Sequence, residues 1–160
     1  MKVFASDYDG TLFKNREITK KDLDAINKFR EEGNLFGIVT GRPIDSIMFE
    51  IKKYSIPVDF LVGINGGVVL DENFEILYVS SFEHDVVPLL MKTLEEERVH
   101  YYGVNDGFGM TRVAVEMEDT ETQFNIELSS FEDLESNGIN AMYVRSQSNE
   151  HAIEVSKKIN

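Results

Sequence analysis

Cysteine is absent from this chain of 160 residues, and histidine is scarce. Without cysteine there is no disulfide framework, no thiolate metal site and no cysteine nucleophile. The three histidines, His84, His100 and His151, are scattered and lack the spacing of metal ligands. No apolar run is long enough to cross a membrane, and no apolar signal segment precedes Asp7. We therefore expect no membrane partner, no cleaved signal and a cytoplasmic location.

Basic residues are also few, because 16 lysines and arginines stand against 29 aspartates and glutamates, a net charge of −13. A chain this acidic is unsuited to the phosphate backbone of nucleic acid, so we expect no nucleic-acid partner. The imbalance is concentrated in residues 83–135, which hold 14 acidic and three basic residues. Such a segment either prefers a substrate with a cationic group or is a solvated outer face, and we favour the second interpretation.

Strand and helix patterns alternate through the first 67 residues. A composition of 42% hydrophobic residues is enough for one core, or for a core with a small appended lobe. Short apolar runs predict buried strands over residues 3–6, 35–39 and 60–62. Amphipathic helices are expected to begin near Thr19 and at Pro43. Strands that alternate with helices predict βαβ units, and hence an α/β fold with a parallel sheet.

The pattern changes after residue 67. Two apolar runs, 68–70 and 76–79, predict a β-hairpin, and Ser80-Ser81 is a plausible hinge. Beyond it, the patterns predict helices over 86–98, 131–136 and 149–159 and strands over 100–104, 110–115 and 140–145. We therefore predict two domains, residues 1–80 and residues 81–160.

The most informative segment is Asp7-Tyr8-Asp9-Gly10-Thr11-Leu12, directly after the first apolar run. Two carboxylates two positions apart at the end of a strand project to the same side. Because such carboxylates repel, either a cation lies between them or one of them holds a proton. A divalent metal with oxygen ligands suits the pair and leaves room for a phosphate. One carboxylate could then attack phosphorus while the other carries a proton.

Polar residues also follow the second and third predicted strands. Thr40-Gly41-Arg42 offers a hydroxyl and the start of a helix, both of which suit a phosphate oxygen. Arg42 could clamp a substrate anion or pair with Asp45. Asn65-Gly66 could line the pocket of a leaving group, or it could be a plain turn. Because the carboxyl ends of parallel strands form one edge of the sheet, these residues should lie close to Asp7 and Asp9.

The motif D-x-D-G-T-L at Asp7–Leu12 resembles the first motif of the haloacid dehalogenase (HAD) superfamily of phosphohydrolases. The T-G-R run ending at Arg42 and the stretch through Asn65 and Gly66 are similar to those of its Cof-like subfamily. The resemblance implies a three-layer Rossmann-like core, with residues from about 81 onward forming the first part of an inserted α/β cap.

The resemblance also implies roles for single residues. Asp7 would be the nucleophile that forms an aspartyl-phosphate, and Asp9 the acid and base. Magnesium would be held by the Asp7 carboxylate and the Asp9 carbonyl. The candidate contacts to phosphate or substrate are Thr11, Thr40, Gly41, Arg42, Asn65 and Gly66. The substrate would be a small phosphorylated metabolite, with a sugar phosphate as one candidate.

Two motifs of this superfamily are missing, a lysine and a G-D-x-x-N-D stretch that completes the magnesium site. The run from Asn105 to Met110 looks similar but is better explained as a hairpin turn. Without the strand that carries the later motifs, the first strand becomes an open apolar edge that could pair with a second chain. We therefore expect these residues to be the N-terminal part of a longer enzyme, with both its core and its cap incomplete.

Two other interpretations stay open. The chain could belong to an enzyme that transfers the phosphoryl group to a second hydroxyl, as phosphomutases do. Alternatively, it could be a catalytically incomplete binding or interaction module that retains Asp7 and Asp9 without turnover.

Overall fold

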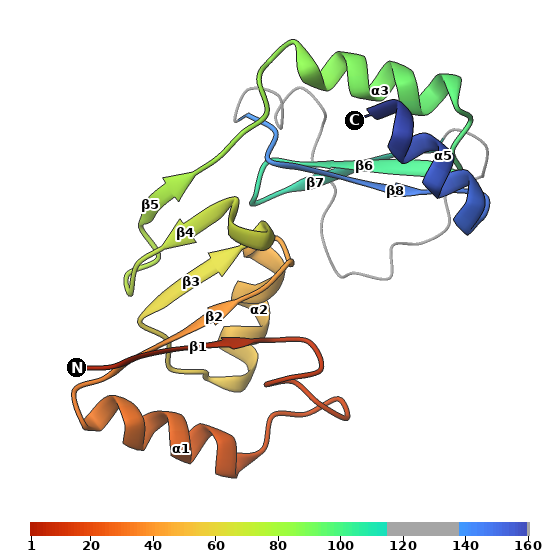
Figure 1. The fold of residues 1–160 in the computed structure, drawn as a ribbon. Helices are drawn as coiled ribbons and strands as arrows, with labels where there is room; N and C mark the ends of the chain where they lie inside the picture. The colour runs from red at the N-terminus through yellow and green to blue at the C-terminus, as the bar shows by residue number, and fades with distance from the viewer. Residues whose placement is uncertain (115–137, 160) are drawn as a thin grey trace. The chain divides into compact units, whose positions relative to one another are not determined.

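The computed structural model describes residues 1–114 and 138–159 (Figure 1). The chain divides into two compact units, Met1–Ser80 and Ser81–Asn160. Each unit has its own sheet and its own buried residues, so each is described by itself.

The first unit is built on a five-stranded sheet. Its elements are β1 (Val3–Asp7), α1 (Lys20–Glu31), β2 (Leu35–Val39), α2 (Ile44–Tyr54), β3 (Phe60–Gly63), a 3₁₀ turn η1 (Ile64–Gly66), β4 (Val68–Leu70) and β5 (Ile76–Val79). The strands lie in the order β1-β2-β3-β4-β5. The first three are parallel, and β4 and β5 add an antiparallel hairpin. The predicted α/β, Rossmann-like core is therefore confirmed in an incomplete form.

Local sequence signals account for both helices of this unit. The hydroxyl of Thr19 caps α1 by accepting a hydrogen bond from the Asp22 amide at 3.2 Å, as a capping residue does. Gly33 follows the helix with a φ of +80°, which favours glycine. For α2 the expected boundary is wrong by one residue, because Pro43 has a ψ of 152° and lies before the helix, which begins at Ile44.

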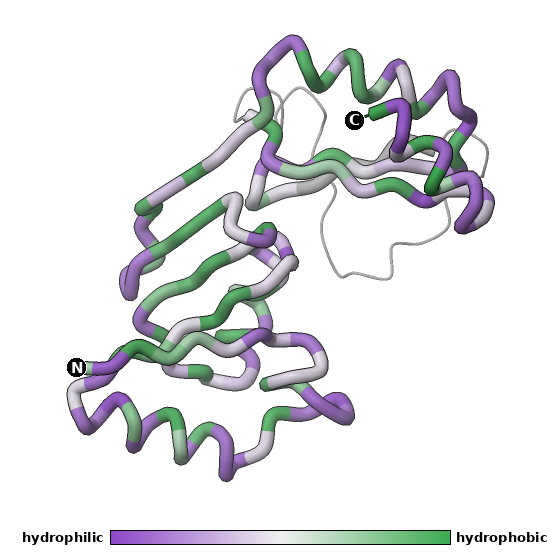
Figure 2. The backbone as a smooth tube through the Cα atoms, in the orientation of Figure 1, coloured by the Kyte–Doolittle hydropathy of each residue, from purple (hydrophilic) through white to green (hydrophobic). Residues whose placement is uncertain are grey.

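One face of the sheet carries the helices. Right-handed connections that advance in one direction across a sheet put their helices on the same face. Phe4 and Phe36 lie on this face in register, and the ring of Phe4 also contacts Phe29 of α1. Tyr8 continues the same alternation and reaches Glu50 of α2. Figure 2 shows apolar residues along β2, β3 and β4, the inner strands of the sheet.

Among the described residues β1 forms one edge of this sheet, as the sequence predicted. Val3 is 62% exposed and Phe4 is 53% exposed, which is unusual for apolar residues of a parallel strand. A cavity of about 350 Å³ lies between β1 and α1, and its lining includes Phe4, Leu12 and Phe29. The edge and the cavity together form an apolar surface that no other strand of the described ranges covers.

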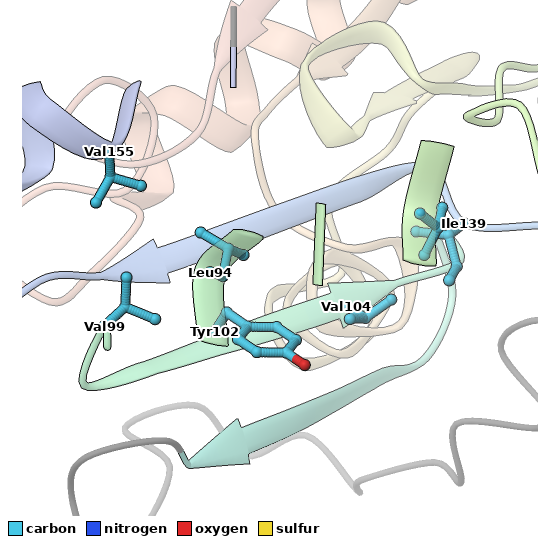
Figure 3. Close-up of a cluster of buried hydrophobic side chains, with 7 residues drawn as sticks. Leu94, Val99, Tyr102, Val104, Ile139 and Val155 are labelled. Atoms are coloured by element: carbon cyan, nitrogen blue, oxygen red, sulfur yellow. The ribbon is translucent and has the colours of Figure 1, made fainter. Parts of the chain in front are cut away.

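The second unit has an antiparallel sheet with the strand order β7-β6-β8. Its described elements are α3 (Val86–Glu96), β6 (Tyr101–Asn105), β7 (Met110–Ala114), β8 (Ala141–Arg145) and α5 (Asn149–Ile159). Figure 3 shows its core, which joins Leu94 of α3 and Val155 of α5 to Tyr102 and Val104 of β6.

The described strands and helices of this unit begin and end within two residues of the bounds that the sequence patterns predicted. The run from Asn105 to Met110 is the turn between β6 and β7, as expected. Amides of Phe108 and Gly109 donate to the Asp106 carboxylate in this turn. The helix expected at 131–136 lies outside the described residues. Within the described ranges, no helix is long and apolar enough to cross a membrane.

Asp59 joins three elements of the first unit. Its carboxylate accepts two hydrogen bonds from Arg30 of α1, at 2.8 and 2.6 Å, and one from the Phe36 amide of β2 at 2.8 Å. The Arg30 guanidinium lowers the pKa of Asp59 below its ordinary value. A carboxyl whose pKa is lower in the folded state stabilises the fold above its unfolded pKa, and this contribution is lost as the pH falls through the folded pKa.

We predict that Asp59→Asn lowers the free energy of unfolding by about 1–3 kcal/mol at pH 7, because Arg30 loses its charged partner. The difference from the unsubstituted protein should shrink as the pH falls below about 4 and through the lowered pKa of Asp59, where protonation removes the charge of this carboxyl. Urea unfolding at pH 7 and pH 3 measures both values. Asp24→Asn, at an exposed position of α1, is the control. An equal loss at both pH values would contradict the assigned role of the ion pair.

Candidate active site

Three turns carry the predicted site residues, one after each of the parallel strands β1, β2 and β3. The register pairs Asp7 with Val39, and Val39 with Val62. The three strands therefore end at nearly the same level, and their turns share one edge of the sheet. This is the edge at which open α/β sheets bind their ligands.

The turn after β1 folds back on Asp7. The hydroxyl of Thr11 donates to the Asp7 carboxylate at 3.1 Å, and the amide of Leu12 donates to the Asp7 carbonyl at 3.3 Å. Gly10, with a φ of +76°, allows this reversal. The Asp7 side chain is exposed at the end of its strand and is oriented by a neutral hydroxyl.

The turns after β2 and β3 are held together by backbone hydrogen bonds. The Asn65 amide donates to the Thr40 carbonyl, and the Ile64 amide donates to the Arg42 carbonyl, both at 3.1 Å. A Cβ atom on Gly41 would lie 2.9 Å from the Asn65 side-chain oxygen, so any larger residue here would displace that side chain. Thr40 is only 4% exposed, and its hydroxyl accepts from the Arg42 amide at 3.2 Å.

The turn after β3 is strained. Ile64, Asn65 and Gly66 all have positive φ, at 50°, 52° and 102°. This conformation suits glycine and is tolerated by asparagine, but it is unfavourable for a β-branched residue. The burial of Ile64 and the two hydrogen bonds to the β2 turn hold it in place. Strain of this kind concentrates at functional sites.

Arg42 forms a bidentate ion pair with Asp9. Its Nε donates to Asp9 Oδ2 at 2.7 Å and its Nη2 donates to Asp9 Oδ1 at 2.6 Å. These hydrogen bonds raise the pKa of Arg42. The sequence offered a substrate anion or Asp45 as partners for this guanidinium, and neither alternative anticipated Asp9. The separation of 33 residues gives no sequence signal for the pair.

Two residues that the sequence analysis did not select complete this cluster. Glu50 of α2 lies 3.7 Å from the Arg42 guanidinium and accepts a hydrogen bond from the Tyr8 hydroxyl at 3.0 Å. Burial, together with the Glu50 carboxylate, raises the pKa of Tyr8. Tyr8 occupies the variable position between the two aspartates, and Glu50 lies on the helix eight positions after Arg42, so neither belongs to a motif that sequence reading can recognise.

Comparison with known proteins assigns the chain to a family. The sequence model of the haloacid dehalogenase-like hydrolases matches residues 4–160. The chain belongs to the haloacid dehalogenase-like hydrolase family. No curated protein matches it significantly.

Solved structures of other HAD proteins share the fold. A haloacid dehalogenase-like hydrolase from Bacteroides thetaiotaomicron is 18% identical with a TM-score of 0.75, and the match covers 99% of this chain and 62% of that one. A sugar phosphatase of HAD subclass IIB is 20% identical with a TM-score of 0.72, over 99% of this chain and 63% of that one. A HAD/COF-like hydrolase from Plasmodium vivax is 30% identical with a TM-score of 0.55, over 69% of this chain and 41% of that one.

This HAD-like chain thus spans between 41% and 63% of the length of these three structures. The family and its Rossmann-like fold were both predicted from the motifs and are confirmed. The strand register and the hydrogen bonds between turns place the predicted site residues at one edge of the sheet, and their roles stay predictions. No group of three metal-ligating side chains was found among the described residues.

We predict that Asn65→Ala unfolds more easily than Asn65→Gly by about 1 kcal/mol, because only the glycine variant relieves the positive φ. Both variants lose the carboxamide group and its contacts, so the difference between them reports the cost of placing a Cβ-bearing residue at this positive φ. Urea unfolding of the two variants measures it. Equal stabilities would show that the turn is not strained at this position.

Proposed function

We propose that this chain is the N-terminal part of a magnesium-dependent phosphatase that hydrolyses a small phosphorylated metabolite. One observation carries the proposal: the HAD first motif supplies two carboxylates at the same sheet edge as the buried hydroxyl of Thr40. Carboxylates that can attack phosphorus and transfer a proton, next to donors for a phosphate, form the minimum set for phosphoryl transfer.

In the proposed reaction Asp7 is the nucleophile. One of its carboxylate oxygens forms a bond to phosphorus as the bond from phosphorus to the leaving oxygen breaks. Asp9 gives a proton to that oxygen, so the product leaves as a neutral alcohol. Asp9 then takes a proton from water, whose oxygen attacks the aspartyl-phosphate. Inorganic phosphate leaves, and the Asp7 carboxylate is restored.

The turns after β2 and β3 would hold the phosphate. The Thr40 hydroxyl and the amides at the start of α2 can donate to its oxygens, and the helix terminus adds partial positive charge. Thr11, Gly41, Asn65 and Gly66 are the remaining candidate contacts. Because Thr40 is almost fully buried, its hydroxyl is fixed in position before a ligand arrives.

The donors at this edge fit a magnesium ion. Mg²⁺ is commonly bound through one or two protein carboxylates, waters and substrate phosphates, so it needs no complete protein cage. The exposed Asp7 carboxylate and the Asp9 carbonyl would hold it, which leaves the Asp9 side chain for proton transfer. When bound, magnesium neutralises charge between the carboxylate and the incoming phosphate.

We also propose that the second unit is part of a cap that selects the leaving group. A lobe joined to the core at Ser80-Ser81 suits that task, because caps exclude water and recognise the part of the substrate that is not transferred. A sugar phosphate is the class we favour, since the subclass IIB relative is a sugar phosphatase.

We predict that Asp7→Asn, made in the product of the complete native gene, abolishes release of phosphate from sugar phosphates. The amide is a poor nucleophile, so turnover should fall by at least about 10³-fold while the unfolding curve changes little. Asp24→Asn is the control for a surface charge.

Two results would contradict this proposal. Phosphate release by Asp7→Asn at near-normal rates would exclude Asp7 as the nucleophile. Metal-dependent phosphate binding without any turnover in the native protein would favour a binding module. Phosphorylated sugar formed from an added acceptor, in place of free phosphate, would instead indicate a phosphotransferase.

We further propose that the 160-residue chain associates with itself through the β1 edge. An uncovered apolar edge strand pairs readily with another strand. We predict that Val3→Lys reduces the association seen by sedimentation at increasing concentration, because a charge at an edge opposes pairing. Leu89→Lys is the matched control, since Leu89 of α3 is 64% exposed and Val3 is 62% exposed. Equal effects of the two changes would exclude the β1 edge.

A further inference from the structure

The side chain of Arg42 connects two carboxylates. On one side its guanidinium holds Asp9 through the two hydrogen bonds described above. On the other side its Nη1 lies 3.7 Å from Glu50 Oε1. The Arg42 side chain is 21% exposed, the Glu50 side chain 15% and the Asp9 side chain 53%. Arg42 therefore lies between two carboxylates, Glu50 on its sheltered side and Asp9 on its exposed side.

Tyr8 supports both Arg42 and Glu50 from the protein interior. It is fully buried, and its ring stacks on Phe13 with centroids 5.4 Å apart and planes 2° apart. The guanidinium carbon of Arg42 lies 4.9 Å from the centre of the Tyr8 ring, within the range of a cation–π interaction. The Tyr8 hydroxyl donates to Glu50 at 3.0 Å. The ring and the hydroxyl of one residue thus fix both the arginine and its second carboxylate.

We propose that Glu50 and Tyr8 are positioning residues for Asp9 and that they act through Arg42. The inference rests on the proposed role of Asp9 as acid and base. It assigns Arg42 to Asp9, a partner that was neither of the two alternatives offered by the sequence, a substrate anion or Asp45. The two hydrogen bonds of its fork are made to Asp9, and the remaining nitrogen faces Glu50.

The physical reason is the exposure of Asp9. A half-exposed aspartate samples several rotamers, whereas the carboxylate that takes a proton from water in the second step must stay within hydrogen-bonding reach of that water. A bidentate arginine fixes both the position and the plane of a carboxylate. A long arginine side chain has considerable rotamer freedom of its own, so it can orient Asp9 only if Glu50 and Tyr8 restrain it.

Glu50→Gln tests the proposal, because it keeps the size of the side chain and an acceptor for Tyr8 while it removes the charge next to Arg42. The chain provides an internal reference in Arg30, which makes a bidentate pair of the same geometry with Asp59. NMR signals of the arginine Nε–H groups report both pairs in one sample. We expect hydrogen exchange at Arg42 to accelerate severalfold in Glu50→Gln, with Arg30 unchanged. Unchanged exchange at Arg42 would overturn the proposal.

The same sample separates the two roles of Arg42. Inorganic phosphate is added to the unsubstituted protein while the Nε–H signals are followed. If Arg42 serves Asp9, its signal keeps its position at phosphate concentrations that shift the amides near Thr40. If phosphate displaces Asp9 from the guanidinium, the Arg42 signal shifts with those amides, and the proposal is wrong.

Kinetics of the native enzyme provide the second test. Glu50→Gln and Tyr8→Phe should each lower kcat by about tenfold, with KM within about twofold of the unsubstituted enzyme, because these changes loosen the orientation of Asp9 and leave substrate binding intact. Tyr8→Phe removes only a hydroxyl, so it keeps the stacking even if Glu50→Gln disturbs folding. Glu96→Gln removes an exposed partner of Lys92 and serves as the control.

A raised KM with unchanged kcat would overturn the proposal, since Arg42 would then bind the substrate anion. If the native protein releases no phosphate at all, the proposed function fails. The NMR comparison of Arg42 with Arg30 still decides whether Glu50 restrains the ion pair. A failure of the proposed function can therefore be distinguished from a failure of the proposed positioning role of Glu50 and Tyr8.

Discussion

Parallel pairing of β1, β2 and β3 is the constraint on which the candidate site depends. Its register aligns Asp7 with Val39, and Val39 with Val62, so three turns that are distant in sequence end at one edge. A shift of one residue would turn the side chains of a strand to the opposite face of the sheet. The hydrogen bonds from Ile64 and Asn65 to the β2 turn then fix two of these turns against each other.

The same sheet has an open side. β1 is an edge strand within the described residues, and its exposed apolar side chains adjoin a cavity next to α1. The chain spans at most 63% of the three HAD structures compared with it. Asp7 at the end of β1 and Asp9 in the turn after it thus adjoin a strand that has no outer neighbour among the described residues. Stability and chemistry of this unit consequently depend on the same strand.

Sequence reading predicted the elements that local chemistry determines. Thr19 marked the start of α1 through its side-chain cap, and short apolar runs marked the strands. Sequence reading failed for features that depend on contacts between residues distant in the chain. The partner of Arg42 is 33 residues away, Glu50 lies on a helix that no motif marks, and the positive φ of Ile64 contradicts the preference of an isoleucine. Tertiary packing determines each of these features, and packing cannot be derived from the local patterns of a single sequence.

The central claim is that Asp7 accepts the phosphoryl group. The most direct measurement is to quench a single turnover of the native enzyme with acid, reduce the acyl phosphate with borohydride, and examine the peptide that contains Asp7 by mass spectrometry. Our account predicts homoserine at position 7 and unchanged aspartate at position 9. Release of phosphate with an unmodified Asp7, in samples where a known aspartyl-phosphate is reduced efficiently, would contradict it.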